Sequence, residues 1–100
     1  MKVDLDVPIE FKGQKIQGQT AGDVLFQYLS NYGGLRGELR VATSHILGKI
    51  VTAEDKVELN GKELSQLKEA WEKACNEENF KVPLMYDMGI KEILKNLGSD

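Results

Sequence analysis

Apolar and polar side chains alternate without interruption along residues 3–11 at the start of the chain. A β-strand has a side-chain period of two, so all the apolar members of this segment fall on one face, namely Val3, Leu5, Val7, Ile9 and Phe11. Gly13 can then supply the positive φ of a turn, and residues 15–17 can form a short returning strand. Pro8 lacks an N–H donor and therefore belongs at an edge or a bulge. The pattern predicts an N-terminal β-hairpin.

Helical spacing replaces this alternation after Thr20. Thr20 and Asp23 have the spacing of a capping box, which predicts a helix over residues 21–31. We expect this helix to end at the following glycines, with Gly33 in the left-handed cap conformation. A second helix is predicted over residues 36–51, where apolar residues recur every three to four positions.

A short third strand over residues 57–59 and two more helices complete the predicted order of elements. Asn60 and Glu63 form a second capping-box pattern, which predicts a helix that continues to Asn76. Pro83 suits the first position of the last helix, whose predicted apolar positions are Leu84, Met88, Ile90, Ile93, Leu94 and Leu97. The sequence therefore predicts an α+β fold in which an N-terminal β-hairpin, with or without the short third strand, packs on about four α-helices.

Composition indicates one globular domain over residues 1–100, with 41% hydrophobic and 29% charged residues. The net charge of −3 argues against non-specific binding of nucleic acid, which requires a basic face. No apolar run approaches the roughly 20 residues of a membrane span, and the first residues lack the apolar core of a signal peptide. Cys75 is the only cysteine and indicates a reducing compartment. We expect a cytoplasmic protein.

Candidate catalytic chemistry is sparse in this sequence. His45 is the only histidine, and its neighbour Ser44 would point about 100° away from it on a helix. Cys75 falls on the apolar stripe of the predicted third helix, where a cysteine acts as a small core residue. Asp4 and Asp6 lie on the polar face of the first strand, which is typical of a solvated surface. We therefore expect no enzyme, no cofactor and no metal site.

The segment from Tyr32 to Arg40 is the best candidate for a binding site. Its glycines leave backbone N–H groups accessible at the start of a helix, where the helix dipole favours an anion. The only two arginines of the chain lie here, four residues apart and on one face of the predicted helix, and a nearby tyrosine could stack on a base. The candidate binding residues are Tyr28, Tyr32, Gly33, Gly34, Arg36 and Arg40. A tight turn followed by a solvated helix face would explain the same residues.

The order of these features resembles a group of small phage and prophage proteins of mostly unassigned function. The shared features are the alternating first strand, the Gly13 turn, the Thr-capped helix that contains Gly22, and residues 57–59 placed before the stretch 63–68. Residues 33–37 are not part of that pattern. The resemblance implies a phage setting, in which small accessory proteins assemble virions or block host defences, and it supplies no catalytic residues.

The functional prediction is a non-enzymatic accessory protein that acts by binding in the host cytoplasm. The leading hypothesis is a counter-defence inhibitor that binds a host protein or sequesters an anionic, nucleotide-like signal. The alternative is an assembly factor for the virion tail or head. We also expect a homo-oligomer, because a lone hairpin leaves an open strand edge and the chain has more aromatic residues than so small a core needs, namely Tyr28, Tyr32, Trp71, Phe80 and Tyr86.

Overall fold

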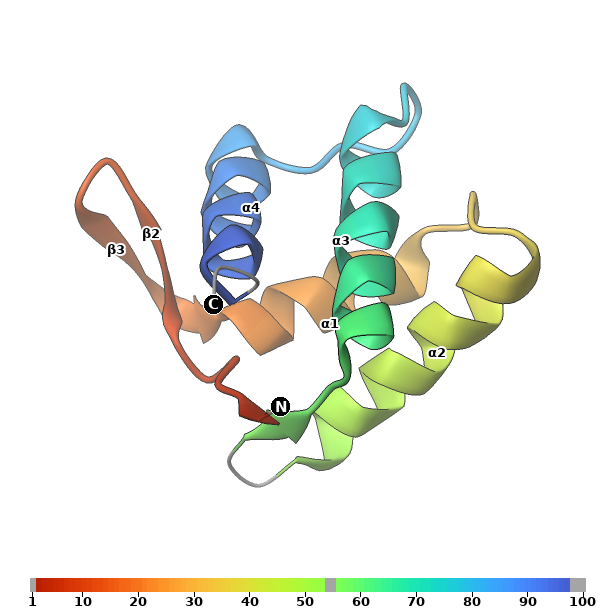
Figure 1. The fold of residues 1–100 in the computed structure, drawn as a ribbon. Coiled ribbons are helices and arrows are strands. Elements are labelled where there is room, and N and C mark those ends of the chain that lie inside the picture. Colours follow the sequence, from red (N-terminus) through yellow and green to blue (C-terminus); the bar gives the residue numbers. More distant parts are fainter. Residues whose placement is uncertain (1, 54–55, 98–100) are drawn as a thin grey trace.

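The computed structural model describes residues 2–53 and 56–97 and shows a small compact α+β domain with a radius of gyration of 12.6 Å. Two small antiparallel sheets accompany four helices (Figure 1). The helices are α1 (Ala21–Asn31), α2 (Gly37–Thr52), α3 (Gly61–Asn76) and α4 (Leu84–Leu97). The strands are β1 (Lys2–Val3), β2 (Pro8–Phe11), β3 (Gln14–Thr20) and β4 (Val57–Glu58). The predicted fold class is confirmed.

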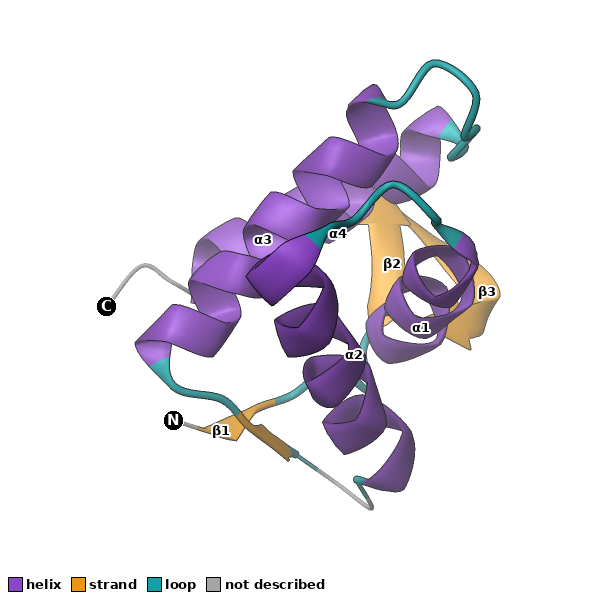
Figure 2. Cartoon of the chain, turned by 90° about the vertical axis from the view of Figure 1, so that its right-hand side faces the viewer, coloured by secondary structure: helices purple, strands orange, loops and turns teal. Residues whose placement is uncertain are grey.

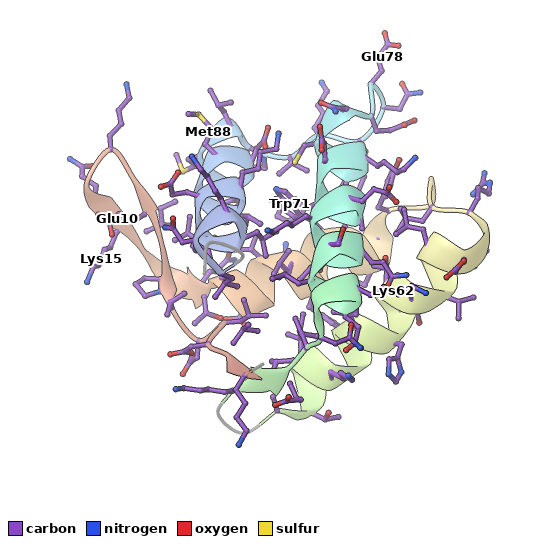
Figure 3. The ribbon with its side chains drawn as sticks, viewed as in Figure 1. Glu10, Lys15, Lys62, Trp71, Glu78 and Met88 are labelled. Carbon is purple, nitrogen blue, oxygen red and sulfur yellow. The ribbon has the colours of Figure 1, made fainter. Side chains whose placement is uncertain are left out.

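The hairpin consists of β2 and β3 and turns at Lys12 and Gly13, both of which have positive φ. Glu10 and Lys15 are paired across the two strands, and Figure 3 shows both side chains on the hairpin. The register shifts between Pro8 and Ile9, so Pro8 lies at an irregularity of the ladder, in agreement with the prediction of an edge or a bulge. β3 is longer than predicted and leads directly into α1.

The prediction of one continuous strand over residues 3–11 is wrong. β1 pairs with β4, so the two chain segments that contain Val3 and Val57 lie side by side, and the chain between β1 and β2 is not a strand. There the Leu5 carbonyl accepts a hydrogen bond from Gly22 N (2.9 Å), and the Val7 carbonyl accepts one from Ala21 N (2.8 Å). These carbonyls satisfy N–H groups at the start of α1, which have no partner within the helix, in place of a strand ladder.

The apolar face of that first segment is nevertheless buried as predicted. Val3, Leu5 and Ile9 are buried and Val7 is half-buried, while the side chain of Phe11 lies outside the described residues. Both capping boxes are confirmed: Thr20 and Asp23 open α1, and Asn60 and Glu63 open α3.

The helices enclose the core from several sides. α3 and α4 run antiparallel, α1 crosses behind them, and α2 packs along α1 and α3 on the side away from the hairpin (Figures 1 and 2). Trp71 of α3 is fully buried at the centre, and its indole Nε1 donates to the Asp87 carbonyl of α4 (3.4 Å; Figure 3).

The last helix differs from its prediction in its first residue and in the residues that it buries. It begins one residue after Pro83, whose carbonyl accepts hydrogen bonds from Tyr86 N and Asp87 N. Leu84 and Met88 were expected in the core but are 66% and 50% exposed, because the face of α4 that meets the hairpin and α3 carries Ile90 and Leu94 instead. Gly98, which was expected to close the helix, lies outside the described residues. Within the described part of the chain no helix has the length and apolar character needed to cross a bilayer.

Candidate functional site

The candidate site is a groove between α1 and α2, near the connection that joins them. It has a volume of about 540 Å³, within the range of small-molecule sites. Leu29, Leu35, Leu47 and Thr43 are its buried residues, and more polar residues surround them. The described residues that line it are Phe26, Leu29, Ser30, Asn31, Tyr32, Gly33, Leu35, Arg40, Thr43, Ser44, Leu47 and Gly48.

Arg40 is the one charged side chain among the described residues of the groove. It lies in the first turns of α2, four residues before Ser44, and both residues are exposed. Residues four apart are neighbours on a helix surface, so the guanidinium and the hydroxyl are placed on the same side of α2. Together they offer donors suited to an anionic group.

Three other polar side chains of the groove already have partners. Ser30 Oγ and Asn31 Nδ2 both donate to the Gln27 carbonyl, at 3.3 and 2.7 Å. The Tyr32 hydroxyl donates to Glu77 Oε2 (3.4 Å), which joins the end of α1 to the end of α3. These residues shape the groove, whereas no hydrogen bond or ion pair engages the Arg40 or Ser44 side chain within the described parts of the chain.

Thr43 has a different status from these residues. It is 2% exposed, and its Oγ1 has no hydrogen-bond partner within the part of the chain that the structure describes. A buried hydroxyl without a partner destabilises a fold by about 1–3 kcal/mol. Thr43 lies in the wall of the groove, so this part of α2 carries a buried hydroxyl that makes no hydrogen bond within the described chain.

Arg36 lies outside the groove, which corrects the prediction that both arginines share one helix face. α2 begins at Gly37, and Arg36 precedes it with extended backbone (φ −134°, ψ 154°). Its Nη1 donates to the Gly33 carbonyl (2.7 Å) and to the Leu35 carbonyl (3.2 Å). Arg36 thus stabilises the connection between α1 and α2, and the structure does not bring it together with Arg40 in the groove.

The glycines of the connection also act differently from expectation. Gly37 has positive φ (59°) and Gly33 does not, because Tyr32 ends α1 in an extended conformation and the chain continues to bury Leu35. Gly34 is required for a packing reason, since a Cβ there would overlap the Tyr32 hydroxyl.

The two candidate tyrosines belong mainly to an aromatic cluster within the chain. Tyr28 contacts Trp71, Phe80 and Tyr86 with ring centroids 5.9–6.3 Å apart, and it does not line the groove. Tyr32 lines the groove, and its ring packs on Phe80 at 5.1 Å. Burial, followed by the neighbouring Glu77 carboxylate, raises the pKa of Tyr32. The surplus of aromatic residues therefore has an explanation within one chain and does not argue for an interface.

Cys75 and His45 do not line the groove. Burial, together with a hydrogen bond to Asp87 and the charge of that carboxylate, raises the pKa of Cys75 to about 12. Its thiol is consequently protonated at neutral pH and is a poor nucleophile. His45 is exposed on α2, and no group of three or more His, Cys, Asp or Glu residues among the described ones is placed to hold a metal ion.

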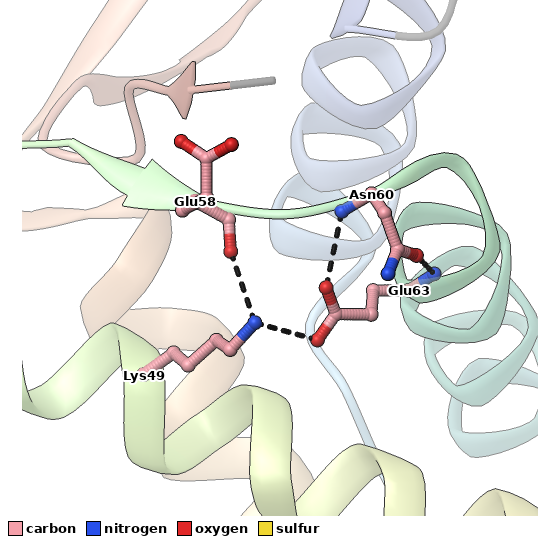
Figure 4. A network of polar contacts seen from close by, with 4 residues as sticks. All are labelled: Lys49, Glu58, Asn60 and Glu63. Carbon is pink, nitrogen blue, oxygen red and sulfur yellow. Dashed lines mark hydrogen bonds and ion pairs between the residues drawn. The ribbon is translucent and has the colours of Figure 1, made fainter.

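A polar network outside the groove has a structural role (Figure 4). Lys49 of α2 donates to the Glu58 carbonyl of β4 (3.2 Å) and pairs with Glu63 Oε2 of α3 (2.8 Å). The hydrogen bond from Lys49, and next the one from the Asn60 backbone, lowers the pKa of Glu63. The network ties α2, β4 and the start of α3 together.

Comparison of the chain with protein-family models, with curated proteins and with solved structures gave no match. Sequence reasoning located the connection and Arg40 but missed Ser44 and Thr43 as parts of the site. The residues between Arg40 and Ser44 carry no motif, and only the packing of α1 against α2 places them around one groove.

Proposed function

We propose that the protein acts by binding and that it sequesters a small anionic, nucleotide-like molecule in the groove between α1 and α2. The observation that carries this proposal is that the Arg40 guanidinium and the Ser44 hydroxyl line the same groove. The groove has no acidic residue among its described members. An arginine fork and hydroxyl donors suit phosphate oxygens. The buried leucines beside them offer an apolar surface to the remainder of the ligand.

The biological setting that we propose follows from the resemblance to small phage accessory proteins. A phage protein that removes a nucleotide signal from the host cytoplasm would act as a counter-defence inhibitor without catalysis. The raised pKa of Cys75 and the exposed position of His45 outside the groove support a role in binding rather than in chemistry. A symmetric homo-oligomer remains part of the proposal.

A second candidate function is docking to a protein, either a host factor or a virion component during assembly. It is favoured by an apolar patch on α4, where Leu84, Met85 and Met88 are 66%, 44% and 50% exposed. Figure 3 labels Met88 on this helix. Methionine side chains adapt to varied partner surfaces, and exposed apolar clusters mark interaction sites.

The experiment that tests the leading proposal is a thermal-shift panel of cyclic and linear nucleotides, with the corresponding nucleosides as uncharged controls. A ligand at 100 times its dissociation constant adds about 2.7 kcal/mol to the free energy of unfolding. For a domain of this size each kcal/mol raises the melting temperature by about 4–8 °C. We expect a saturable rise with a phosphorylated ligand that is absent for its nucleoside. No rise with any nucleotide, or equal rises with nucleotide and nucleoside, would reject the proposal.

A further inference from the structure

A line of five residues follows the outer face of α2 with the spacing of a coiled-coil seam. They are Gly37, Val41, Ser44, Gly48 and Val51, at successive intervals of four, three, four and three residues. All five are exposed, and the two valines are 71% and 59% exposed. A repeat of 3.5 positions is the spacing at which one helix packs along another, and here the repeat carries two valines, two glycines and one serine. None of the five carries a charge.

This seam is complementary to itself when two copies of α2 run antiparallel with Ser44 at the centre. Val41 of one copy then faces Gly48 of the second copy, and Val51 faces Gly37 near the opposite end. Each valine side chain then faces a glycine of the other copy, and the two Ser44 residues meet at the two-fold axis. Such a match of a surface with its own copy is the requirement for an isologous dimer.

Gly48 supplies an independent reason to expect a close neighbour outside the chain. It lies in the interior of α2, although glycine is the poorest helix former after proline. Its φ is not positive, and a Cβ at this position would meet nothing within 4 Å. Nothing in the described chain therefore requires a glycine here, whereas a second helix packed closely against the seam does.

Two charged residues beside the seam are engaged with α3, whereas Arg40 and His45 border the seam on its exposed face. Glu38 pairs with Lys62 (3.3 Å), and Lys49 pairs with Glu63 (2.8 Å), so these side chains reach across to α3. Figure 2 shows α2 along the front of the molecule, with α1 and α3 on either side of it. The seam residues themselves are uncharged and exposed, and Arg40 flanks them.

The apolar patch on α4 does not have this symmetry. Leu84 and Met88 are followed on the same exposed face by Lys91, Glu92 and Lys95. In an antiparallel pair of α4 helices the apolar half of one copy would meet the charged half of the other. A second copy of the chain therefore fits α2 and not α4.

We propose that the outer face of α2 is the interface of a symmetric homodimer, in which two α2 helices pack antiparallel across the seam centred on Ser44. The contact spans roughly 21 Å of helix, from Gly37 to Val51. One helix pair of this length buries less than the roughly 800 Å² per partner of a standard interface, so association depends on concentration in the micromolar range or above. The dimer does not require a ligand in the groove, but Ser44 and Gly48 belong to both features. A dimer centred on Ser44 would therefore cover the hydroxyl that the proposed ligand uses, and dimerisation would compete with ligand binding.

Sedimentation velocity over about 1 µM to about 1 mM tests this interface, since interfaces of this kind dissociate in that range. We expect a reversible dimer for the natural chain and at least a tenfold weaker association for Val41→Glu. The matched control is Ser65→Glu, which places the same charge on an exposed position of α3 and leaves the dimer unchanged. A natural chain that stays monomeric throughout the range, or a Val41→Glu variant that associates normally, overturns the proposal.

Gly48→Leu distinguishes the effect of this position on the stability of the monomer from its effect on dimerisation. Because the space around Gly48 is open and leucine is a better helix former, the monomer should melt at a higher temperature at low concentration. The same leucine would keep two seams apart and reduce association at least tenfold. Higher stability with undiminished association would contradict the proposed packing.

The two-fold axis is tested separately by cysteine cross-linking. Ser44→Cys should form a disulfide-linked dimer under mild oxidation, because the two positions meet at the axis. Ser65→Cys and the natural chain, which retains Cys75, report background oxidation. Cross-linking of Ser44→Cys that does not exceed both controls would reject the antiparallel arrangement.

Discussion

Gly89 of α4 lies directly against Ile9 of β2, so closely that a Cβ at position 89 would overlap Ile9 Cγ2. Both residues are buried. The hairpin has few other places at which to bury its apolar face, and a two-stranded hairpin alone is only marginally stable in water. The absence of a side chain at Gly89 is therefore what allows β2 to pack on α4.

Gly89→Ala is expected to destabilise the protein despite the better helix propensity of alanine. The added methyl group must displace Ile9 or move the hairpin, and overpacking of this kind costs about 1–3 kcal/mol. Urea unfolding measures the change. Gly61→Ala is the control, since a Cβ there would meet nothing within 4 Å. If both variants are equally stable, the contact with Ile9 does not constrain the fold.

Gly89 also illustrates what local sequence patterns can and cannot specify. The capping boxes at Thr20 and Asn60 depend on residues three positions apart, and both helices begin where those patterns predict. The pairing of Val3 with Val57 joins distant segments, and alternation along residues 3–11 gave no sign of it. The hydrogen bonds of the Leu5 and Val7 carbonyls to α1 likewise depend on tertiary structure.

The candidate site was predictable only in part for the same reason. Two arginines four apart suggest one helix face, but the positive φ of Gly37 places Arg36 before the helix. Arg40 could be identified because arginine is rare in this chain. Thr43 and Ser44 could not, because their position around the groove depends on how α1 packs against α2.

Glu63→Gln is expected to lower stability at neutral pH and to have no effect in acid. The pKa of Glu63 is lowered from its ordinary value of 4.5, chiefly by the hydrogen bond from Lys49. A group with a lowered pKa in the folded state stabilises the fold above its ordinary pKa, and that contribution is lost as pH falls through the lowered value. We expect a loss of up to about 1 kcal/mol at pH 7 that fades below about pH 4.

Urea unfolding of the natural chain and of Glu63→Gln at several pH values measures this difference. Glu69→Gln, an exposed position on the same helix, serves as the control for removal of one negative charge. If Glu63→Gln is less stable than the natural chain by the same amount in acid as at pH 7, the carboxylate charge is not the source of the difference in stability.

Cys75 is expected to react slowly with iodoacetamide. With a pKa of about 12 instead of the ordinary 9.0, its thiolate fraction near pH 8 is lower by on the order of a thousandfold, and the thiolate is the reactive form. Asp87→Asn should accelerate the reaction, because it removes a negative charge that opposes ionisation. The rate is followed by mass spectrometry, with urea-unfolded protein as the reference. Equal rates in the folded and unfolded protein would contradict the raised pKa.

Thr43→Val is expected to stabilise the unliganded protein by about 1 kcal/mol, because it replaces a buried hydroxyl without a partner by a methyl group of similar shape. Thr52→Val on the same helix is the control, since the Thr52 hydroxyl donates to the Gly48 carbonyl (2.9 Å) and gains nothing from removal. Thermal melts compare the two variants. A destabilised Thr43→Val would indicate that the hydroxyl has a partner in solution.

Arg36→Ala is expected to lower stability and Arg40→Ala to weaken ligand binding, because the two arginines have different surroundings. Arg36 donates to the Gly33 and Leu35 carbonyls, so its removal should lower stability by about 1 kcal/mol through loss of these bonds. Arg40 is exposed beside the groove, and its removal should change stability by less than about 0.5 kcal/mol. It should weaken binding of a phosphorylated ligand roughly 10- to 100-fold, the value of a charged hydrogen bond.

Thermal melts and titration calorimetry on the two single variants separate these roles. Arg40→Lys retains the charge but loses the planar fork, and we expect it to bind between Arg40→Ala and the natural chain. Ligand binding that survives Arg40→Ala but not Arg36→Ala would move the site from the groove to the connection between α1 and α2. A large fall in melting temperature for Arg40→Ala would instead show that Arg40 stabilises the fold.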